Sequence, residues 1–240
     1  MMCVTDIWIV EVRTGSTRSV DSHKLEPVTE PGTRAERKER TRRALMDGTL
    51  ELLRDRSFAS VSLREVARSA GIVPTAFYRH FASMDDLGVA LVEDSMRMLR
   101  QMLRDARKDP SVKNAAESFA ILVRQMRSHE EQFRFLSRER YGGVTAVRQA
   151  FATELRMFVG ELTVDLARMP GLSTWDVADL EMAADLIVST MLTATVGLLE
   201  IDRPGSPKEQ DLVRRTEQQV RLIVLGMGSW NPRHRVEGNR

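Results

Sequence analysis

One short stretch of the sequence, residues 63–81 (LREVARSAGIVPTAFYRHF), gathers many hydrogen-bonding side chains beside aromatic ones. The polar side chains are Thr75, Tyr78, Arg79 and His80, and the aromatic ones are Phe77 and Phe81. Short side chains at the start of a helix can approach base edges, and Tyr, His and Arg side chains can hold phosphates. The set therefore favours nucleic-acid recognition. The structural alternative is that Tyr78 and His80 merely cap their own domain, but their neighbours favour the functional interpretation.

Catalytic chemistry has no comparable support. The sequence contains no HExxH, GxSxG, Walker or Gly-rich nucleotide motif, and its four His and one Cys form no Cys-His cluster. We therefore predict that the protein is not an enzyme and that it needs no metal or other cofactor. The single cysteine, Cys3, excludes an internal disulfide, which fits the reducing cytoplasm where we expect the protein to work.

Positive charge is concentrated around the same stretch, although the whole chain has a formal net charge of only +2. Residues 34–82 hold 11 basic and 6 acidic side chains, whereas residues 83–240 hold 22 basic and 23 acidic ones. A local positive field attracts phosphate polyanions. An ordinary solvated helix face would have a similar composition, so charge alone leaves both interpretations open.

Two short helices joined by a tight turn must position these side chains. The capping-box spacing of Ser62 and Glu65 predicts a helix that Gly71 ends. Pro74 fits the first turn of the next helix, which we expect to run to about His80. This is a helix–turn–helix pattern with an apolar mini-core on its inner side. The predicted members of that core are Leu52, Leu53, Phe58, Leu63, Val66, Ala67, Phe77 and Phe81.

The rest of the chain has helical periodicity, and no segment alternates as a strand would. We predict an all-α fold, with an N-terminal three-helix helix–turn–helix unit and a larger C-terminal helical bundle. The predicted parts are a flexible tail (or an upstream start-codon artefact) at 1–33, a DNA-binding domain at 34–82 and a ligand-binding and dimerisation domain at 83–240. The predicted helices lie at 34–57, 63–70, 74–80, 84–108, 112–128, 130–140, 144–168, 174–201 and 207–228.

A family resemblance accompanies these residues. The segment FASVSLREVARSAGIVPTAFYRHFASMDDL, residues 58–87, resembles the TetR family of bacterial transcriptional regulators. Together with the segments LRQMLRDAR and FRFLSRER, it looks like the FabR/DesT group of that family. The resemblance implies a repressor of genes for unsaturated fatty-acid synthesis that senses long-chain acyl thioesters. Two positions depart from the broad family, which often has a capping Ser or Thr at Val73 and a phosphate-binding Lys at Met84.

The resemblance also implies specific contacts with a double-stranded DNA operator. Base edges and thymine methyl groups would lie against Pro74, Thr75 and Ala76, and phosphates would lie against Tyr78 and His80. The complete predicted DNA-binding set is Arg40, Arg43, Ser62, Arg64, Pro74, Thr75, Ala76, Tyr78, Arg79 and His80. A pseudo-palindromic operator would match the two-fold symmetry of a homodimer.

We expect the last two long helices to form the dimer interface, because they carry small and apolar residues that allow close approach. The predicted interface residues are Leu186, Thr190, Thr193, Ala194, Gly197, Leu222 and Leu225. The alternative is that these helices bury their faces within one chain. The most apolar run, residues 186–199, is too short to span a bilayer, so we expect no membrane partner.

A hydrophobic effector would bind inside the bundle, and the resemblance suggests long-chain acyl-CoA. The predicted ligand-binding residues are Phe119, Leu122, Met126, Phe133, Phe135, Arg138, Phe151, Leu155, Phe158 and Met182. Arg138 belongs to an arginine-rich segment that suits a phosphate or thioester head group. From spacing alone, a salt-bridged surface helix explains that segment equally well.

Two other functions remain open at this point. One is a TetR-type regulator of efflux or drug response that senses another hydrophobic molecule. The other is a helical acyl-CoA-binding module that never touches DNA. The basic segment at 34–43 and the polar side chains of the second short helix argue against the module.

Overall fold

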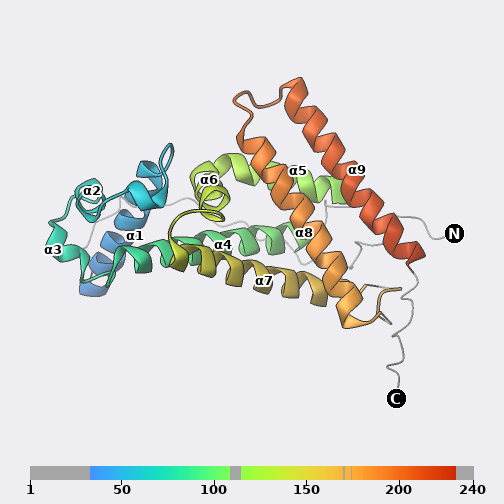
Figure 1. The fold of residues 1–240 in the computed structure, drawn as a ribbon, viewed down its shortest axis with the longest axis horizontal. Coiled ribbons are helices and arrows are strands. Elements are labelled where there is room, and N and C mark those ends of the chain that lie inside the picture. The colour runs from blue at the N-terminus through green and yellow to red at the C-terminus, as the bar shows by residue number, and fades with distance from the viewer. Residues whose placement is uncertain (1–32, 109–114, 170, 174, 231–240) are drawn as a thin grey trace, which may run out of the picture.

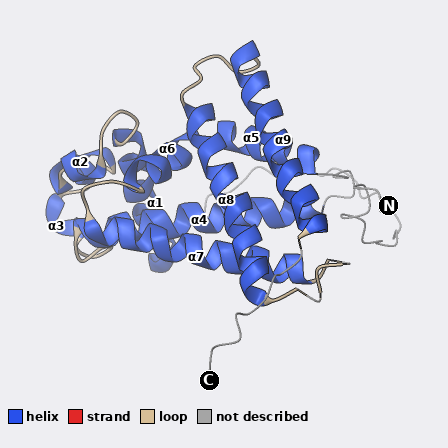
Figure 2. Ribbon diagram, turned by 45° about the vertical axis from the view of Figure 1, so that its right-hand side comes forward, coloured by secondary structure: helices blue, strands red, loops and turns tan. Residues whose placement is uncertain are grey.

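The computed structural model describes residues 33–108, 115–169, 171–173 and 175–230, and within them the chain forms helices and no strand (Figures 1 and 2). Of the predicted tail, these ranges include only Thr33. The helices are α1 (Arg34–Leu52), α2 (Leu63–Ser69), α3 (Pro74–Phe77), α4 (Met84–Lys108), α5 (Ala115–Ser128), α6 (Glu130–Glu139), α7 (Thr145–Ala167), α8 (Val177–Leu199) and α9 (Pro207–Ser229). A 3-10 turn, η2 (Phe58–Ser60), lies between α1 and α2.

The three N-terminal helices lie at one end of the molecule, and α8 and α9 lie toward the other (Figure 1). The long helix α4 extends from the N-terminal unit into the bundle and packs along α7. In turn α7 packs against α8, and α8 packs against α9. The all-α prediction is therefore confirmed for the described residues.

Local side-chain caps explain where several helices begin. Thr33 and Glu36 form a capping box at α1, and Ser62 and Glu65 form another at α2. These side chains satisfy backbone N–H groups that have no partner within the first turn of a helix. Gly71, with φ at 67°, supplies the left-handed residue after α2.

Two helices end earlier than predicted. The first stops at Leu52 rather than near residue 57, since the segment that follows turns toward η2. The short helix α3 is regular only to Phe77, and the chain then continues in tight turns. In those turns Arg79 N donates to Ala76 O and His80 N donates to Phe77 O. Tyr78, Arg79 and His80 therefore extend from a turn and not from a longer helix.

One continuous apolar core joins the N-terminal unit to the bundle. It includes Leu45 of α1, Phe77 of α3, Leu91 of α4, Phe135 of α6 and Phe151 of α7, all buried. Seven of the eight predicted mini-core residues belong to this packing or border it, and the eighth, Ala67, is completely buried. The core therefore runs across the predicted domain boundary at residue 82, so the N-terminal unit packs directly on the bundle.

Helix α8 is long and apolar enough to cross a membrane by length and composition, and it is the one described helix with that property. Part of its surface is nevertheless buried inside the protein. Ala184, Val188 and Leu198 pack in the core against neighbouring helices. Other apolar residues of the same helix are exposed, and they matter for the association of subunits discussed below.

Candidate nucleic-acid interface

Helix α3 sits on a fully apolar base and presents its polar side chains outward. Phe77 is completely buried against α2, where Val66 and Ala67 are also buried. On the opposite side Thr75 and Tyr78 are exposed. A short helix held by a buried aromatic residue, with small and polar side chains outside, has the form of a recognition helix that can enter a major groove.

The structure exposes most of the predicted DNA-binding residues. The exposed ones are Arg40, Arg43, Ser62, Arg64, Pro74, Thr75, Tyr78 and Arg79, and the half-buried ones are Ala76 and His80. Pro74, Thr75, Ala76, Tyr78, Arg79 and His80 follow one another in α3 and the turn after it. Their contact with DNA stays a prediction.

Arg43 already has a partner within the protein. Its Nη1 lies 2.7 Å from Oδ2 of Asp94 on α4, and this contact raises the pKa of Arg43. A phosphate contact would require this exposed salt bridge to exchange its carboxylate for a phosphate. Such pairs stabilise a protein only slightly, so the exchange is energetically accessible.

Ser62 uses its hydroxyl in the cap of α2. Its Oγ donates to Oε2 of Glu65 at 2.7 Å and accepts from the Glu65 N–H at 3.4 Å. Glu65 also pairs with Arg56 at 2.9 Å. The Arg56 hydrogen bond, followed by those from Ser62, lowers the pKa of Glu65 to about 2. The start of α2 is therefore a connected polar cluster.

His80 lies in a positively charged environment. Its pKa is lowered, first by burial and then by the nearby charges of Lys38, Arg42 and Arg79. Its Nδ1 is buried and has no hydrogen-bond partner. The surroundings thus favour a neutral ring in the free protein, while the three cations would attract a phosphate.

Arg42 is a residue of this region that the sequence prediction missed. Its Nη1 donates to the backbone oxygen of His80 at 3.1 Å, and its guanidinium carbon lies 4.3 Å from the ring centroid of Phe81. Lys38 was also outside the predicted set. Both belong to the basic run of α1, but no local pattern distinguishes them from their neighbours.

Val73 stands at the N-cap of α3 and makes no side-chain capping bond. Pro74 follows as the first residue of the helix, where a missing N–H costs nothing. The start of this helix therefore depends on proline and on tertiary packing.

The predicted ligand-binding residues divide among separate parts of the core. Phe135, Phe151, Leu155 and Phe158 pack in or against the core shared with the N-terminal unit. Leu122, Met126 and Phe133 belong to a second cluster with α8. Met182 is exposed on α8, and the side chain of Phe119 lies outside the described part of the chain. A common cavity for these residues stays a prediction.

Arg138, whose contact with a ligand head group stays a prediction, contacts the backbone. Its guanidinium donates to the carbonyl oxygens of Leu53, Arg54 and Arg56.

Among the residues described, no group of His, Cys, Asp and Glu could hold a metal ion.

The predicted dimer residues fall into two groups. Leu186, Leu222 and Leu225 are large, apolar and exposed, and Thr193 is exposed on the same helix as Leu186. Ala194 is instead buried in the chain's own core. A Cβ added at Gly197 would lie 2.9 Å from Leu212 of α9, so Gly197 serves the packing of α8 on α9. Thr190 is half-buried, and its hydroxyl donates to Leu186 O.

Comparison with known structures reveals many chains of the same architecture. The fatty acid degradation regulator FadR from Bacillus halodurans aligns with a TM-score of 0.58 and 17% identity, over 81% of this chain and 97% of its own. FadR from Bacillus subtilis, solved in complex with stearoyl-CoA, gives 0.58 and 17% over 77% and 98%. A putative tetR family transcription regulator from Shewanella sp. PV-4 gives 0.60 and 14% over 78% and 97%.

The sequence comparison is concentrated in the N-terminal unit. Residues 45–91 match the family model of bacterial regulatory proteins of the tetR family. This range spans the C-terminal part of α1 from Leu45, the helix–turn–helix and the first turns of α4. It includes the buried base of α3 and the exposed residues above it. The prediction that the chain is not an enzyme agrees with this assignment. The N-terminal unit of this chain is that of the TetR family of bacterial regulatory proteins, and a helical C-terminal region completes the fold.

Proposed function

We propose that this protein is a TetR-type transcriptional repressor that binds a pseudo-palindromic operator as a homodimer and responds to a long-chain acyl-CoA. The observation that carries the proposal is the outward face of α3. Thr75 is exposed there and Tyr78 is exposed in the turn that follows, where Lys38, Arg42 and Arg79 surround His80 with positive charge. Small side chains suit the bases, and the cations suit the flanking phosphates.

Dimerisation is supported by the exposed apolar residues of the last two helices. Leu186 and Met182 on α8 and Leu222 and Leu225 on α9 are all exposed. Large apolar side chains exposed on two helices that pack together are typical of an interaction surface. A second copy would bury them and place two recognition helices in successive turns of the major groove.

The acyl-CoA effector is supported by the names of two similar structures. One is a fatty acid degradation regulator, and the other was solved with stearoyl-CoA. The mechanism would be a two-state shift, in which the effector and the operator each favour one separation of the DNA-binding units. Linkage then requires that each alters the affinity of the other by the same factor. The regulated genes would belong to fatty-acid metabolism, with unsaturated fatty-acid synthesis as our specific hypothesis.

A regulator of efflux or drug response is the alternative within the family. Fluorescence anisotropy distinguishes the two, using full-length protein, DNA from its own upstream region, and saturated or unsaturated long-chain acyl-CoA. We expect salt-dependent specific binding that one or both acyl-CoAs change. Specific binding that both acyl-CoAs leave unchanged would support the repressor function and contradict the proposal of a lipid effector. A lack of specific binding to that DNA and to a random DNA library would remove the repressor as well.

A further inference from the structure

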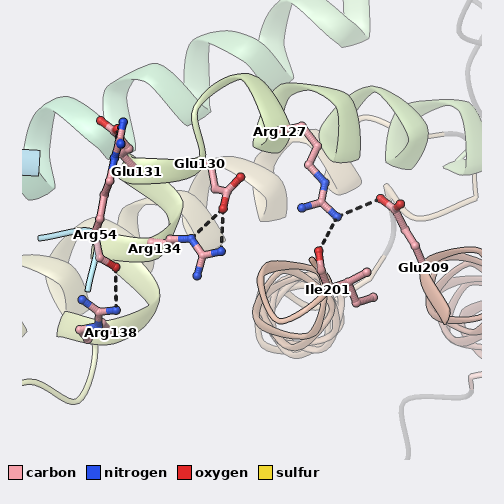
Figure 3. Close-up of polar contacts among 8 residues, drawn as sticks. All are labelled: Arg54, Arg127, Glu130, Glu131, Arg134, Arg138, Ile201 and Glu209. Atoms are coloured by element: carbon pink, nitrogen blue, oxygen red, sulfur yellow. Dashed lines mark hydrogen bonds and ion pairs between the residues drawn. The ribbon is translucent and has the colours of Figure 1, made fainter. Parts of the chain in front are cut away.

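The end of α6 is hydrogen-bonded to the segment that follows α1, residues 53–58. Nη1 of Arg138 donates to Leu53 O at 2.7 Å and to Arg56 O at 2.6 Å, and Nη2 donates to Arg54 O at 3.1 Å. Figure 3 shows the guanidinium of Arg138 beside the Arg54 carbonyl. These carbonyls belong to the non-helical segment after α1, where backbone oxygens need partners from elsewhere in the protein. One planar cation thus satisfies three oxygens in a fixed geometry.

The next residue, Glu139, contacts the same segment at Phe58. Its side chain is almost completely buried, and Oε1 accepts a 2.8 Å hydrogen bond from the backbone N–H of Phe58. Oε2 is buried without a hydrogen-bond partner. A Cβ at Gly142 would overlap this oxygen, so glycine there makes room for the carboxylate. A buried carboxylate is expensive, and an apolar residue would fill the space at lower cost.

Residues 53–58 lead directly to the helix–turn–helix. The Arg56 side chain continues from it to Oε1 of Glu65, which caps α2. The ring of Phe58 meets that of Phe135 edge-on, with centroids 6.4 Å apart. Hydrogen bonds therefore connect α6 to the first helix of the DNA-binding motif in two steps, through Arg138 and then through Arg56.

The rest of the contact between the two parts includes apolar packing in the shared core and the exposed salt bridges Arg43–Asp94 and Arg54–Glu131. Apolar burial is not directional, whereas hydrogen bonds to fixed backbone groups hold in a narrow range of orientations. We propose that Arg138 and Glu139 are positioning residues, which fix the orientation of the helix–turn–helix on the bundle and thereby set the half-site spacing that the dimer accepts. This inference rests on the proposed function and gives Arg138 a role at this junction.

The test measures spacing preference with the full-length protein. An operator is first selected by the wild type from a random DNA library, and versions with one base pair added or removed between the half-sites are then made. One base pair moves the half-sites by about 3.4 Å and rotates them by about 35°. Affinity for each version is measured by fluorescence anisotropy at fixed salt concentration.

Four variants separate positioning from general stability. Arg138→Lys keeps the charge but cannot reach three carbonyls with one ammonium group. Glu139→Ala removes the acceptor for Phe58, and Glu139→Gln restores one. Arg134→Ala is the matched control, because Arg134 pairs with Glu130 inside α6 (Figure 3).

We expect Arg138→Lys and Glu139→Ala to lower the preference for the selected spacing by about tenfold, the factor that one charge-assisted hydrogen bond represents. Glu139→Gln and Arg134→Ala should keep the wild-type preference. Unchanged preference in Arg138→Lys and Glu139→Ala, with lower melting temperature alone, would overturn the inference and leave the proposed function intact. If Glu139→Ala does not fold, Arg138→Lys decides. Failure of the wild type to select any paired half-sites would instead overturn the proposed function.

Discussion

The guanidinium of Arg42 holds the backbone of His80, although the two residues are 38 positions apart in sequence. The hydrogen bond from Nη1 to the His80 oxygen measures 3.1 Å, and the same guanidinium lies over the ring of Phe81. A side chain of helix α1 thus holds the end of the turn that follows α3. Arg42, which the predicted DNA-binding set did not include, therefore supports the motif from within the protein.

Replacing Arg42 by Met should destabilise the protein. The change removes the hydrogen bond to His80 and the cation–π contact with Phe81, which together are worth about 1–2 kcal/mol. Urea unfolding followed by circular dichroism measures the loss. Arg40→Met is the control, since Arg40 is exposed on the same helix. Equal stability of the two variants would contradict the supporting role of Arg42.

Thr75→Ala should change the choice of DNA sequence. Thr75 is exposed on α3, where a side chain can reach base edges, and a lost base contact costs about 1–3 kcal/mol at the bases it reads. Arg64→Ala, at a predicted phosphate contact, should weaken binding to all sequences and reduce the salt dependence by about one counterion. Competition binding with specific and random duplexes measures both. If Thr75→Ala keeps the wild-type site preference, the orientation assigned to α3 is wrong.

Operator binding should strengthen as the pH falls from 7.5 toward 6. Burial, followed by the charges of Lys38, Arg42 and Arg79, lowers the pKa of His80 in the free protein, whereas a phosphate at the ring would raise it. DNA binding would then take up a proton at pH values between the lowered pKa of His80 in the free protein and its higher pKa in the complex. His80→Asn should remove this part of the pH dependence, measured by anisotropy at constant ionic strength. Affinity that weakens or stays level over this range in the wild type would exclude a phosphate contact by protonated His80.

Leu222→Glu should convert the dimer into a monomer. Leu222 is 72% exposed on α9, and a charge buried in a subunit interface without a partner is strongly unfavourable. Analytical ultracentrifugation gives the mass, and operator affinity should fall with it. Val164→Glu, at an exposed apolar residue of α7, is the matched control. A dimer that survives Leu222→Glu and dissociates with Val164→Glu would move the interface to another face.

Gly48→Ala should destabilise the protein although alanine is the better helix former. A Cβ at Gly48 would lie 2.9 Å from Cβ of Ser69 where α1 crosses α2, so the helices must separate at a cost of about 1–3 kcal/mol. Ser69→Gly should recover part of that loss. At Gly160 in α7 an added Cβ meets nothing within 4 Å, so Gly160→Ala should stabilise by up to about 1 kcal/mol. Thermal unfolding of both variants checks the contrast.

Most helices of this protein could be predicted because their signals are local. The capping box of Ser62 and Glu65 and the proline at the start of α3 are as predicted. The length of α3 could not be predicted in the same way. Its sequence continues in a helical pattern to His80, but the regular helix ends at Phe77, and tertiary contacts such as Arg42 to His80 hold the turn that follows.

The sequence by itself determined the helical fold class, the position of the helix–turn–helix and the polar residues of α3 and the turn after it, since each depends on neighbours within a few positions. Only the tertiary structure decided which arginines are engaged inside the protein. Arg43 pairs with Asp94, 51 positions away, and Arg138 binds the Leu53 carbonyl, 85 positions away. The tertiary structure likewise decided that Ala194 is buried in the core and that Leu222 is exposed. A long side chain's partner, and the face that a uniformly apolar helix buries, depend on how distant segments pack, and no local pattern encodes that packing.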